Sequence, residues 1–145
     1  MRKLLVCTFS GGRTSAFMGR MLQEHPKYKE FDKVFLFANT GKERRETLDF
    51  INKCDKAWNL NVVWLEANVI HEKGVGTNYV KSLGYDEVYT AMGIRFDERH
   101  RESNNAKKDN VIYPLIYDMK VDSKFIRDWW ERQDFDLQLK DYEGN

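Results

Sequence analysis

Cysteine is scarce in this 145-residue sequence, in which only Cys7 and Cys54 occur. Two cysteines cannot build a disulfide framework, a four-cysteine zinc site or a cysteine-held iron–sulfur cluster. We therefore expect neither zinc nor an iron–sulfur cluster in this chain. Each cysteine lies in a stretch with the pattern of a buried element, and burial suppresses the nucleophilic character of a thiol. Both are interpreted as small core residues.

Long apolar runs and a strong net charge are also absent. No run approaches the roughly 20 apolar residues of a membrane-spanning helix, and the N-terminus does not have the pattern of a secretory signal peptide. The expected location is the cytoplasm of a cell or of an infected host, with no membrane partner. The net charge of +1 argues against a general nucleic-acid coat, although residues 95–108 are locally basic.

The length and composition fit one folded unit. A chain of 145 residues can bury a real core but is too short for two ordinary domains. The 41% share of apolar residues is typical of a globular protein and not of a disordered segment. We expect a single domain over residues 1–145.

Apolar runs alternate with helical patterns along the chain. Runs at 3–9, 33–38 and 61–67 predict buried strands, and the segments between them have helical spacing of apolar residues. Strands joined by helices pair in parallel, because parallel neighbours need a crossover. With a fourth strand at 87–94 and a fifth element broken at Pro114, the fold class is α/β. The expected architecture is a parallel, twisted sheet of about five strands with helices on both faces.

The segment "TFSGGRTSAFM" joins the first strand to the first helix. A loop at this point exposes backbone N–H groups without helical partners, and glycines let an anion approach them. A tight turn is the alternative role for Gly11 and Gly12. The spacing fits neither a dinucleotide-binding fingerprint nor a Walker loop. The neighbouring side chains can all donate hydrogen bonds to an oxyanion: Ser10, Arg13, Thr14 and Ser15.

"SGGRTS" resembles the S-G-G-x-x-S PP-loop of the ATP pyrophosphatase superfamily, which includes the PAPS and APS reductases. Three further segments are similar to the PAPS reductase family: "VFLFANTGKERRETLDFI", "YTAMGIRFDER" and "YPLIYDMKVDSKFIRDWWERQDFDL". The chain is most similar to the small phage and prophage members of this family. The resemblance implies an adenine nucleotide α-hydrolase-like, Rossmann-like fold, and a host cytoplasmic location if the protein is phage-encoded.

The resemblance also implies the site. The glycine loop would hold a phosphate, pyrophosphate or sulfate group, the end of the second strand would hold the adenine and ribose, and the "GIRFDER" segment would meet a second anionic group. A solvated, self-paired charge run is the alternative for that segment. Catalytic residues are not identified, since His71 and His100 are candidates by type only. The implied nucleotide-binding residues are Ser10, Gly11, Gly12, Arg13, Thr14, Ser15, Phe37, Ala38, Asn39, Thr40, Gly41, Gly93, Arg95 and Arg99.

The sequence departs from the family in three places. Arg13 and Thr14 stand where many ATP-cleaving members carry Lys and Asp, so Mg²⁺ is a candidate cofactor only with Asp97 or Glu98 as its ligand. The reductases use a C-terminal cysteine motif that this chain does not show. The segment at 68–78 is shorter than in relatives. We therefore do not expect thiol-dependent reduction by this chain alone.

Two classes of function remain at this stage. In the first, the chain binds ATP or a sulfated or phosphorylated adenosine, and cleaves ATP at the α-phosphate to release pyrophosphate. In the second, it is a phage protein that sequesters or senses an adenine nucleotide without turnover, or an accessory subunit of a nucleic-acid modification system. The expected partner is a small-molecule adenine nucleotide rather than nucleic acid. A second copy of the chain and a redox or modification protein are further candidate partners.

Overall fold

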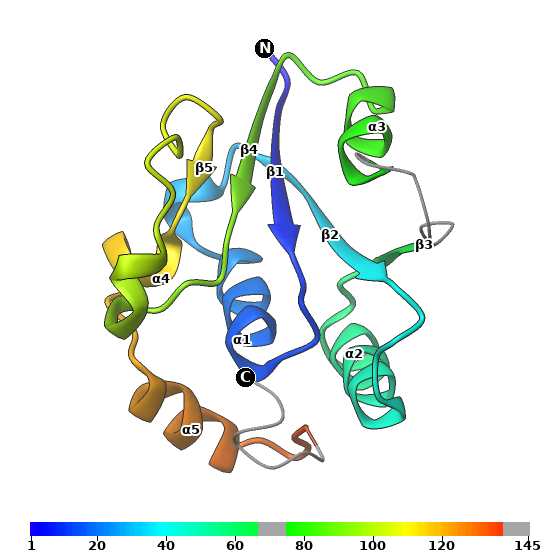
Figure 1. Ribbon diagram of the computed structural model, residues 1–145, viewed down its shortest axis with the longest axis vertical. Helices are drawn as coiled ribbons and strands as arrows, with labels where there is room; N and C mark the ends of the chain where they lie inside the picture. Colours follow the sequence, from blue (N-terminus) through cyan, green and yellow to red (C-terminus); the bar gives the residue numbers. More distant parts are fainter. Residues whose placement is uncertain (67–74, 138–145) are drawn as a thin grey trace.

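The computed structural model describes residues 1–66 and 75–137. In this part of the chain, five parallel strands form one sheet in the order β3-β2-β1-β4-β5 (Figure 1). The fold class predicted from the sequence is confirmed. The strands are β1 (Lys3–Thr8), β2 (Asp32–Asn39), β3 (Val63–Glu66), β4 (Glu87–Ala91) and β5 (Val111–Ile112).

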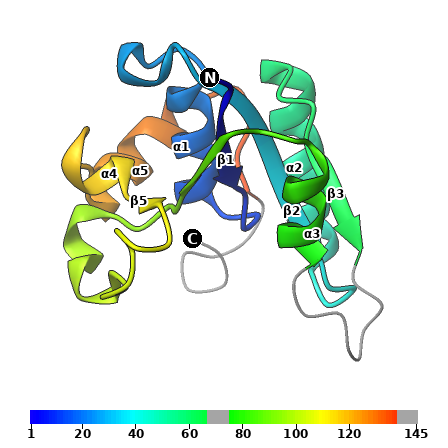
Figure 2. The ribbon, with the colours of Figure 1, turned by 90° about the horizontal axis from the view of Figure 1, so that it is seen from above.

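Helices cover both faces of the sheet. Helices α1 (Arg13–Leu22), α2 (Arg45–Trp58) and α5 (Ser123–Glu131) pack on one face, and α3 (Val75–Ser82) packs on the other. Figure 2 shows α1 and α5 together on one side of β1 and α3 on the opposite side. Three short helical turns complete the description: η1 (Pro26–Tyr28), η2 (Phe96–Arg101) and α4 (Pro114–Tyr117).

Alternating residues of β1 contribute to the apolar cores on the two faces of the sheet. Leu5 and Cys7 face the larger core, whereas Leu4 and Val6 face α3. This alternation follows from the two-residue repeat of a strand, and burial on both faces explains why "LLVC" is a continuous apolar run. The predicted burial of both cysteines is confirmed, because Cys7 and Cys54 lie in the larger core.

Several element boundaries differ from those expected. Strand β4 ends at Ala91, where the chain turns and the Ile94 N–H donates to the Met92 carbonyl at 2.9 Å. The element around Pro114 divides into a two-residue strand and α4, which begins at that proline. Asp122 caps α5 as predicted, accepting a hydrogen bond from the Phe125 N–H at 2.9 Å.

The described residues contain no helix long and apolar enough to cross a membrane. The predictions made for His71, for most of the segment at 68–78 and for the end of the chain fall on residues 67–74 and 138–145, which lie outside the described part.

Candidate functional site

The glycine loop connects the carboxyl end of β1 to the first turn of α1. Gly11 has φ +89°, and a Cβ at this position would lie 2.5 Å from Cγ2 of Thr47 in α2. Both the backbone conformation and the packing therefore require glycine. Gly12 precedes α1 in an extended conformation, and the α1 N-terminus has neither a side-chain cap nor an acidic residue in its first turn. The first turn of α1 itself therefore supplies no side chain to cap or neutralise its free amides.

Two serines fix the shape of this loop. The Ser10 N–H donates to Ser15 Oγ at 3.1 Å, and the two hydroxyl oxygens lie 3.0 Å apart. Ser15 Oγ also lies 3.2 Å from the Gly12 carbonyl oxygen, to which it can donate. These hydroxyls hold the two ends of the loop together.

The segment after β4 approaches the same loop. A Cβ on Gly93 would lie 3.3 Å from the Ser15 Cα, so a glycine allows close contact between this segment and the start of α1. From there Arg95 reaches back, and its Nη1 donates to Thr14 Oγ1 at 3.2 Å. Two motifs that are 81 residues apart in the sequence therefore meet at one point.

Arg95 is also paired with carboxylates. Its Nε lies 3.0 Å from Asp97 Oδ1, and its Nη2 lies 3.3 Å from Glu98 Oε1. Burial raises the pKa of Asp97, but the hydrogen bond and the charge of Arg95 outweigh it and leave this pKa below its ordinary value. Glu98 additionally pairs with Arg101 at 2.9 Å. Both candidate metal ligands are thus engaged by arginines in this structure.

A cavity of about 180 Å³ lies between the loop and the segment after β4. We call it the loop cavity. Pockets that enclose whole small molecules are usually about 300–1,000 Å³, so this volume suits one anionic group rather than a nucleotide. Five of the predicted nucleotide-binding residues line it, Ser10, Thr14, Ser15, Gly93 and Arg95, and so does the candidate metal ligand Glu98. The other lining residues are Thr8, Met92, Ile94 and Arg101.

Two arginines lie differently from the sequence-based interpretation. The Arg13 guanidinium turns to the C-terminal segment, with Nε 2.7 Å from Asp136 Oδ1 and Nη2 donating to the Leu137 carbonyl at 3.2 Å. It does not line the loop cavity. Arg99 lies over the Phe96 ring, 5.1 Å from its centroid, and Arg101 lines the cavity in its place. The basic segment at 95–108 was the only sequence signal for Arg101.

The predicted adenine and ribose residues lie at the end of the adjacent strand, outside the loop cavity. Phe37 is buried against Trp64, so only its backbone can meet a ligand. Ala38 is exposed. Asn39 Oδ1 accepts a hydrogen bond from the Gly41 N–H at 3.1 Å, and Thr40 Oγ1 donates to Glu43 at 2.8 Å. The end of β2 is therefore an ordered turn next to the glycine loop.

Among the described residues, no cysteine or histidine lines the loop cavity. Burial raises the pKa of the Cys7 thiol to about 12. Burial likewise raises the pKa of Cys54, which lies on α2. His100 is exposed on η2 and does not line the cavity.

No family model matches the chain, but the chain is similar in sequence to a phage protein and in fold to solved structures. The chain is 26% identical to the uncharacterized nin region protein ORF290 of Escherichia phage lambda over 188 residues, covering 97% of this chain and 63% of that protein. The aligned region is longer than this chain, so the relative carries additional residues within it.

The second similarity is to a solved structure, the U34-tRNA thiolase NcsA from Methanococcus maripaludis with its [4Fe-4S] cluster. The TM-score is 0.57 at 15% identity, covering 90% of this chain and 55% of the thiolase. This likeness shows the shared fold. The chain spans less than two thirds of the length of either protein.

The thiolase corrects one expectation. We excluded an iron–sulfur cluster on the basis of the cysteine count, and this exclusion was wrong, because a protein of the same fold carries a [4Fe-4S] cluster. Residues on the described part of the chain do not form a group of three or more His, Cys, Asp or Glu side chains able to hold a metal ion.

Proposed function

We propose that this chain is a PP-loop protein related to the PAPS reductases, which binds the phosphate or sulfate group of an adenine nucleotide in the loop cavity. The observation that carries the proposal is the convergence of the uncapped α1 N-terminus and Arg95 on one small cavity. Backbone amides and a guanidinium are the groups that bind oxyanions best in proteins. Two similarities support this proposal: the fold shared with the tRNA thiolase, and the sequence similarity to the phage relative.

The rest of the nucleotide would extend along the rim of the sheet. Ligands of open parallel sheets bind beyond the carboxyl ends of the strands. The exposed end of β2 at Ala38 and the turn at Asn39–Gly41 lie next to the glycine loop and would hold the adenosine. An entering anion would compete with Asp97 and Glu98 for Arg95, and would replace the hydrogen bond from Arg95 to Thr14.

In the enzymatic form of the proposal, ATP is cleaved at the α-phosphate and pyrophosphate leaves. The chain would contribute electrostatic stabilisation from the start of α1 and from the Arg95 guanidinium, because Thr14, Ser15 and Arg95 line the cavity in which the departing charge would lie. Glu98 is the carboxylate lining the loop cavity, and it is held by Arg95 and Arg101. A binder without turnover, which sequesters or senses the nucleotide, needs the same anion site and no proton-transfer group.

Action on nucleic acid is the second candidate function. Its support is the name of the structural neighbour, a tRNA thiolase, together with the exposed basic side chains of Arg99, Lys107 and Lys108. In this version the chain is part of a nucleic-acid modification system of the phage, and its affinity for RNA falls steeply with salt.

Calorimetric titration with ATP, APS and PAPS tests the proposal. We expect at least one of these ligands to bind, and Arg95→Ala to weaken that binding about tenfold or more, because hydrogen bonds to charged groups are the strong ones. Arg99→Ala is the matched control, since it removes the same charge from the same segment without touching the cavity. Pyrophosphate release with Mg²⁺ present separates the enzyme from the binder. If none of the three ligands binds, or Arg95→Ala has no effect, the proposal fails.

A further inference from the structure

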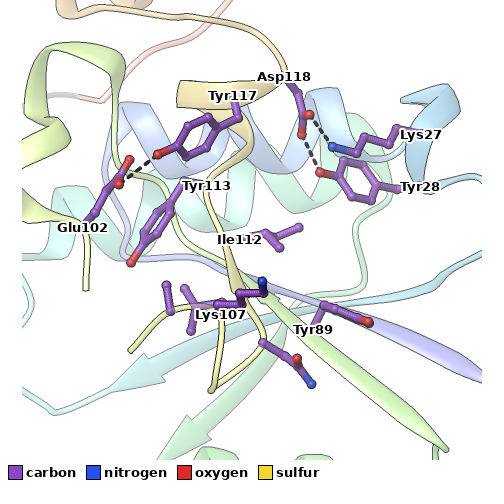
Figure 3. Close-up of a pocket in the computed structure, with 12 residues that line it drawn as sticks. Lys27, Tyr28, Tyr89, Glu102, Lys107, Ile112, Tyr113, Tyr117 and Asp118 are labelled. Atoms are coloured by element: carbon purple, nitrogen blue, oxygen red, sulfur yellow. Dashed lines mark hydrogen bonds and ion pairs between the residues drawn. The ribbon is translucent and has the colours of Figure 1, made fainter. Parts of the chain in front are cut away.

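A second, larger cavity lies at the β5 edge of the sheet, between η1, the segment before β5 and α4 (Figure 3). Its volume is about 580 Å³, which is within the range of pockets that enclose a small molecule. We call it the edge cavity. It shares no lining residue with the loop cavity, and four tyrosines are among its walls: Tyr28, Tyr89, Tyr113 and Tyr117.

The two carboxylates of the edge cavity differ in their hydrogen bonding. Asp118 is satisfied, because one oxygen pairs with Lys27 Nζ at 2.7 Å and the other accepts a short hydrogen bond from the Tyr28 hydroxyl. Glu102 accepts a hydrogen bond from Tyr117 on Oε2 at 3.0 Å, but its Oε1 is buried and has no donor among the described residues. A buried carboxylate oxygen without a donor is costly and calls for a partner.

The contact between Tyr117 and Glu102 can open at little cost. Tyr117 is 62% exposed, so its hydroxyl can exchange Glu102 for water, and such an exchange changes the free energy only slightly. In Figure 3 these two side chains point toward one another at one end of the cavity. Moving Tyr117 frees Oε2, and a ligand with two parallel N–H donors would then satisfy both Oε2 and the unpartnered Oε1 by displacing the atoms that cover Oε1.

We propose that the edge cavity binds a guanine nucleotide, with the Watson–Crick edge of the base on Glu102. A carboxylate only accepts hydrogen bonds. Guanine presents two adjacent donors on that edge, its N1–H and its N2 amino group. Adenine and cytosine each present an acceptor beside their amino group, and uracil presents one N–H between two acceptors. A paired acceptor therefore selects guanine.

The other walls match the rest of such a ligand. Tyrosine rings offer apolar faces on which a base stacks, independently of its hydrogen-bonding edge. Lys107 is exposed and lines the same cavity, and in Figure 3 Tyr113 lies between it and Glu102. Its ammonium would attract the phosphate while Glu102 holds the base. The site would bind a free guanine nucleotide or a guanine in single-stranded RNA, because both present the same base.

Binding of GMP, AMP, CMP and UMP to the full chain tests the proposal, measured by calorimetry. We expect GMP to bind most tightly, and Glu102→Gln to lower the affinity for GMP about tenfold or more. Glutamine offers one acceptor and one donor, and all four bases present a donor next to an acceptor on this edge, so the same variant should lose the preference for GMP. A purely structural role of Glu102 would leave this preference in place. Equal affinities for the four nucleotides, or an unchanged preference in Glu102→Gln, would overturn the proposal.

Further variants keep the test decisive. Tyr117→Phe removes the hydroxyl that competes for Glu102 and should bind GMP at least as tightly as the original chain, so a loss of GMP binding in this variant would contradict the proposal. Lys107→Ala should weaken GMP but not guanosine, whereas Lys108→Ala, which does not line the cavity, should leave both unchanged.

Two comparisons complete the design. A short RNA with one guanine that binds more tightly than GMP identifies a strand as the source of the base, and equal affinity identifies the free nucleotide. The site is independent of the proposed adenine nucleotide, so Arg95→Ala should leave GMP affinity unchanged. Loss of GMP binding in that variant would contradict a separate site.

Discussion

The Trp130 indole N–H donates a hydrogen bond to the backbone carbonyl of Arg13 at 3.0 Å, so the last helix fixes the first turn of α1, directly after the glycine loop. Trp130 is almost fully buried and packs against Phe50 and Trp58. A residue near the C-terminal end of the described chain therefore supports the anion site at its beginning.

Trp130→Phe tests this support. The phenyl ring keeps part of the packing but removes the donor to the Arg13 carbonyl, so we expect the free energy of unfolding to fall by about 1–3 kcal/mol. Urea denaturation measures it. Trp129→Phe is the matched control, because within the described residues the neighbouring indole makes no such hydrogen bond. Equal losses in the two variants would show that packing alone, and not the hydrogen bond, holds α5 in place.

Gly11→Ala should disrupt both the fold and the anion site. The added Cβ would lie 2.5 Å from Thr47 Cγ2, and the left-handed backbone of Gly11 alone costs a non-glycine residue about 1–2 kcal/mol. Gly41→Ala isolates the backbone cost, since Gly41 also has a positive φ but has no atom within 4 Å of an added Cβ. Thermal unfolding should therefore shift more for Gly11→Ala than for Gly41→Ala, and calorimetry should show that the Gly11 variant has lost ATP binding.

How far sequence could predict this site depends on how local each feature is. The glycine loop was recognisable because its residues are consecutive and follow a buried strand. Parallel topology predicts that the ends of adjacent strands lie at one rim, but the position of β4 beside β1, which brings Arg95 to Thr14, was not predicted. The direction in which each side chain of a segment points could not be predicted from the sequence in this way.

Arg99 and Arg101 illustrate that limit. Within η2 the backbone kinks at Glu98, which has non-helical angles of φ −113° and ψ 21°. The kink breaks regular spacing, so the side chain that lines the loop cavity belongs to Arg101 rather than to the Arg99 of the family pattern. The edge cavity was missed for a related reason. Its tyrosines come from η1, β4 and the segment around α4, and no motif joins them.

Cys7 provides a test by pH. Burial raises the pKa of its thiol from an ordinary 9.0 to about 12, so the folded chain keeps the proton that the unfolded chain loses between these values. Stability should therefore be unaffected by this group below pH 9 and fall as the pH rises from 9 toward 12. Urea denaturation of Cys7→Ala beside the original chain measures the difference, which should shrink as the pH rises across this range. Rapid reaction of the native Cys7 thiol with a disulfide reagent at pH 8 would contradict burial.

The ion pair between Arg13 and Asp136 decides between two roles for Arg13. The family resemblance assigns its guanidinium to the nucleotide, whereas the structure places it 2.7 Å from Asp136, with 12% of the Arg13 side chain and 36% of the Asp136 side chain exposed. If its role is to anchor the C-terminal segment, Arg13→Ala and Asp136→Asn should each destabilise the chain. A double-mutant cycle should then give a coupling of up to about 1 kcal/mol, since the acid is partly solvated. Neither variant should change the affinity for ATP beyond the effect of stability, whereas Arg95→Ala should. If instead Arg13→Ala abolishes ATP binding while Asp136→Asn leaves it intact, the guanidinium must leave Asp136 and turn to the nucleotide on binding, and the contact seen here is the ligand-free arrangement.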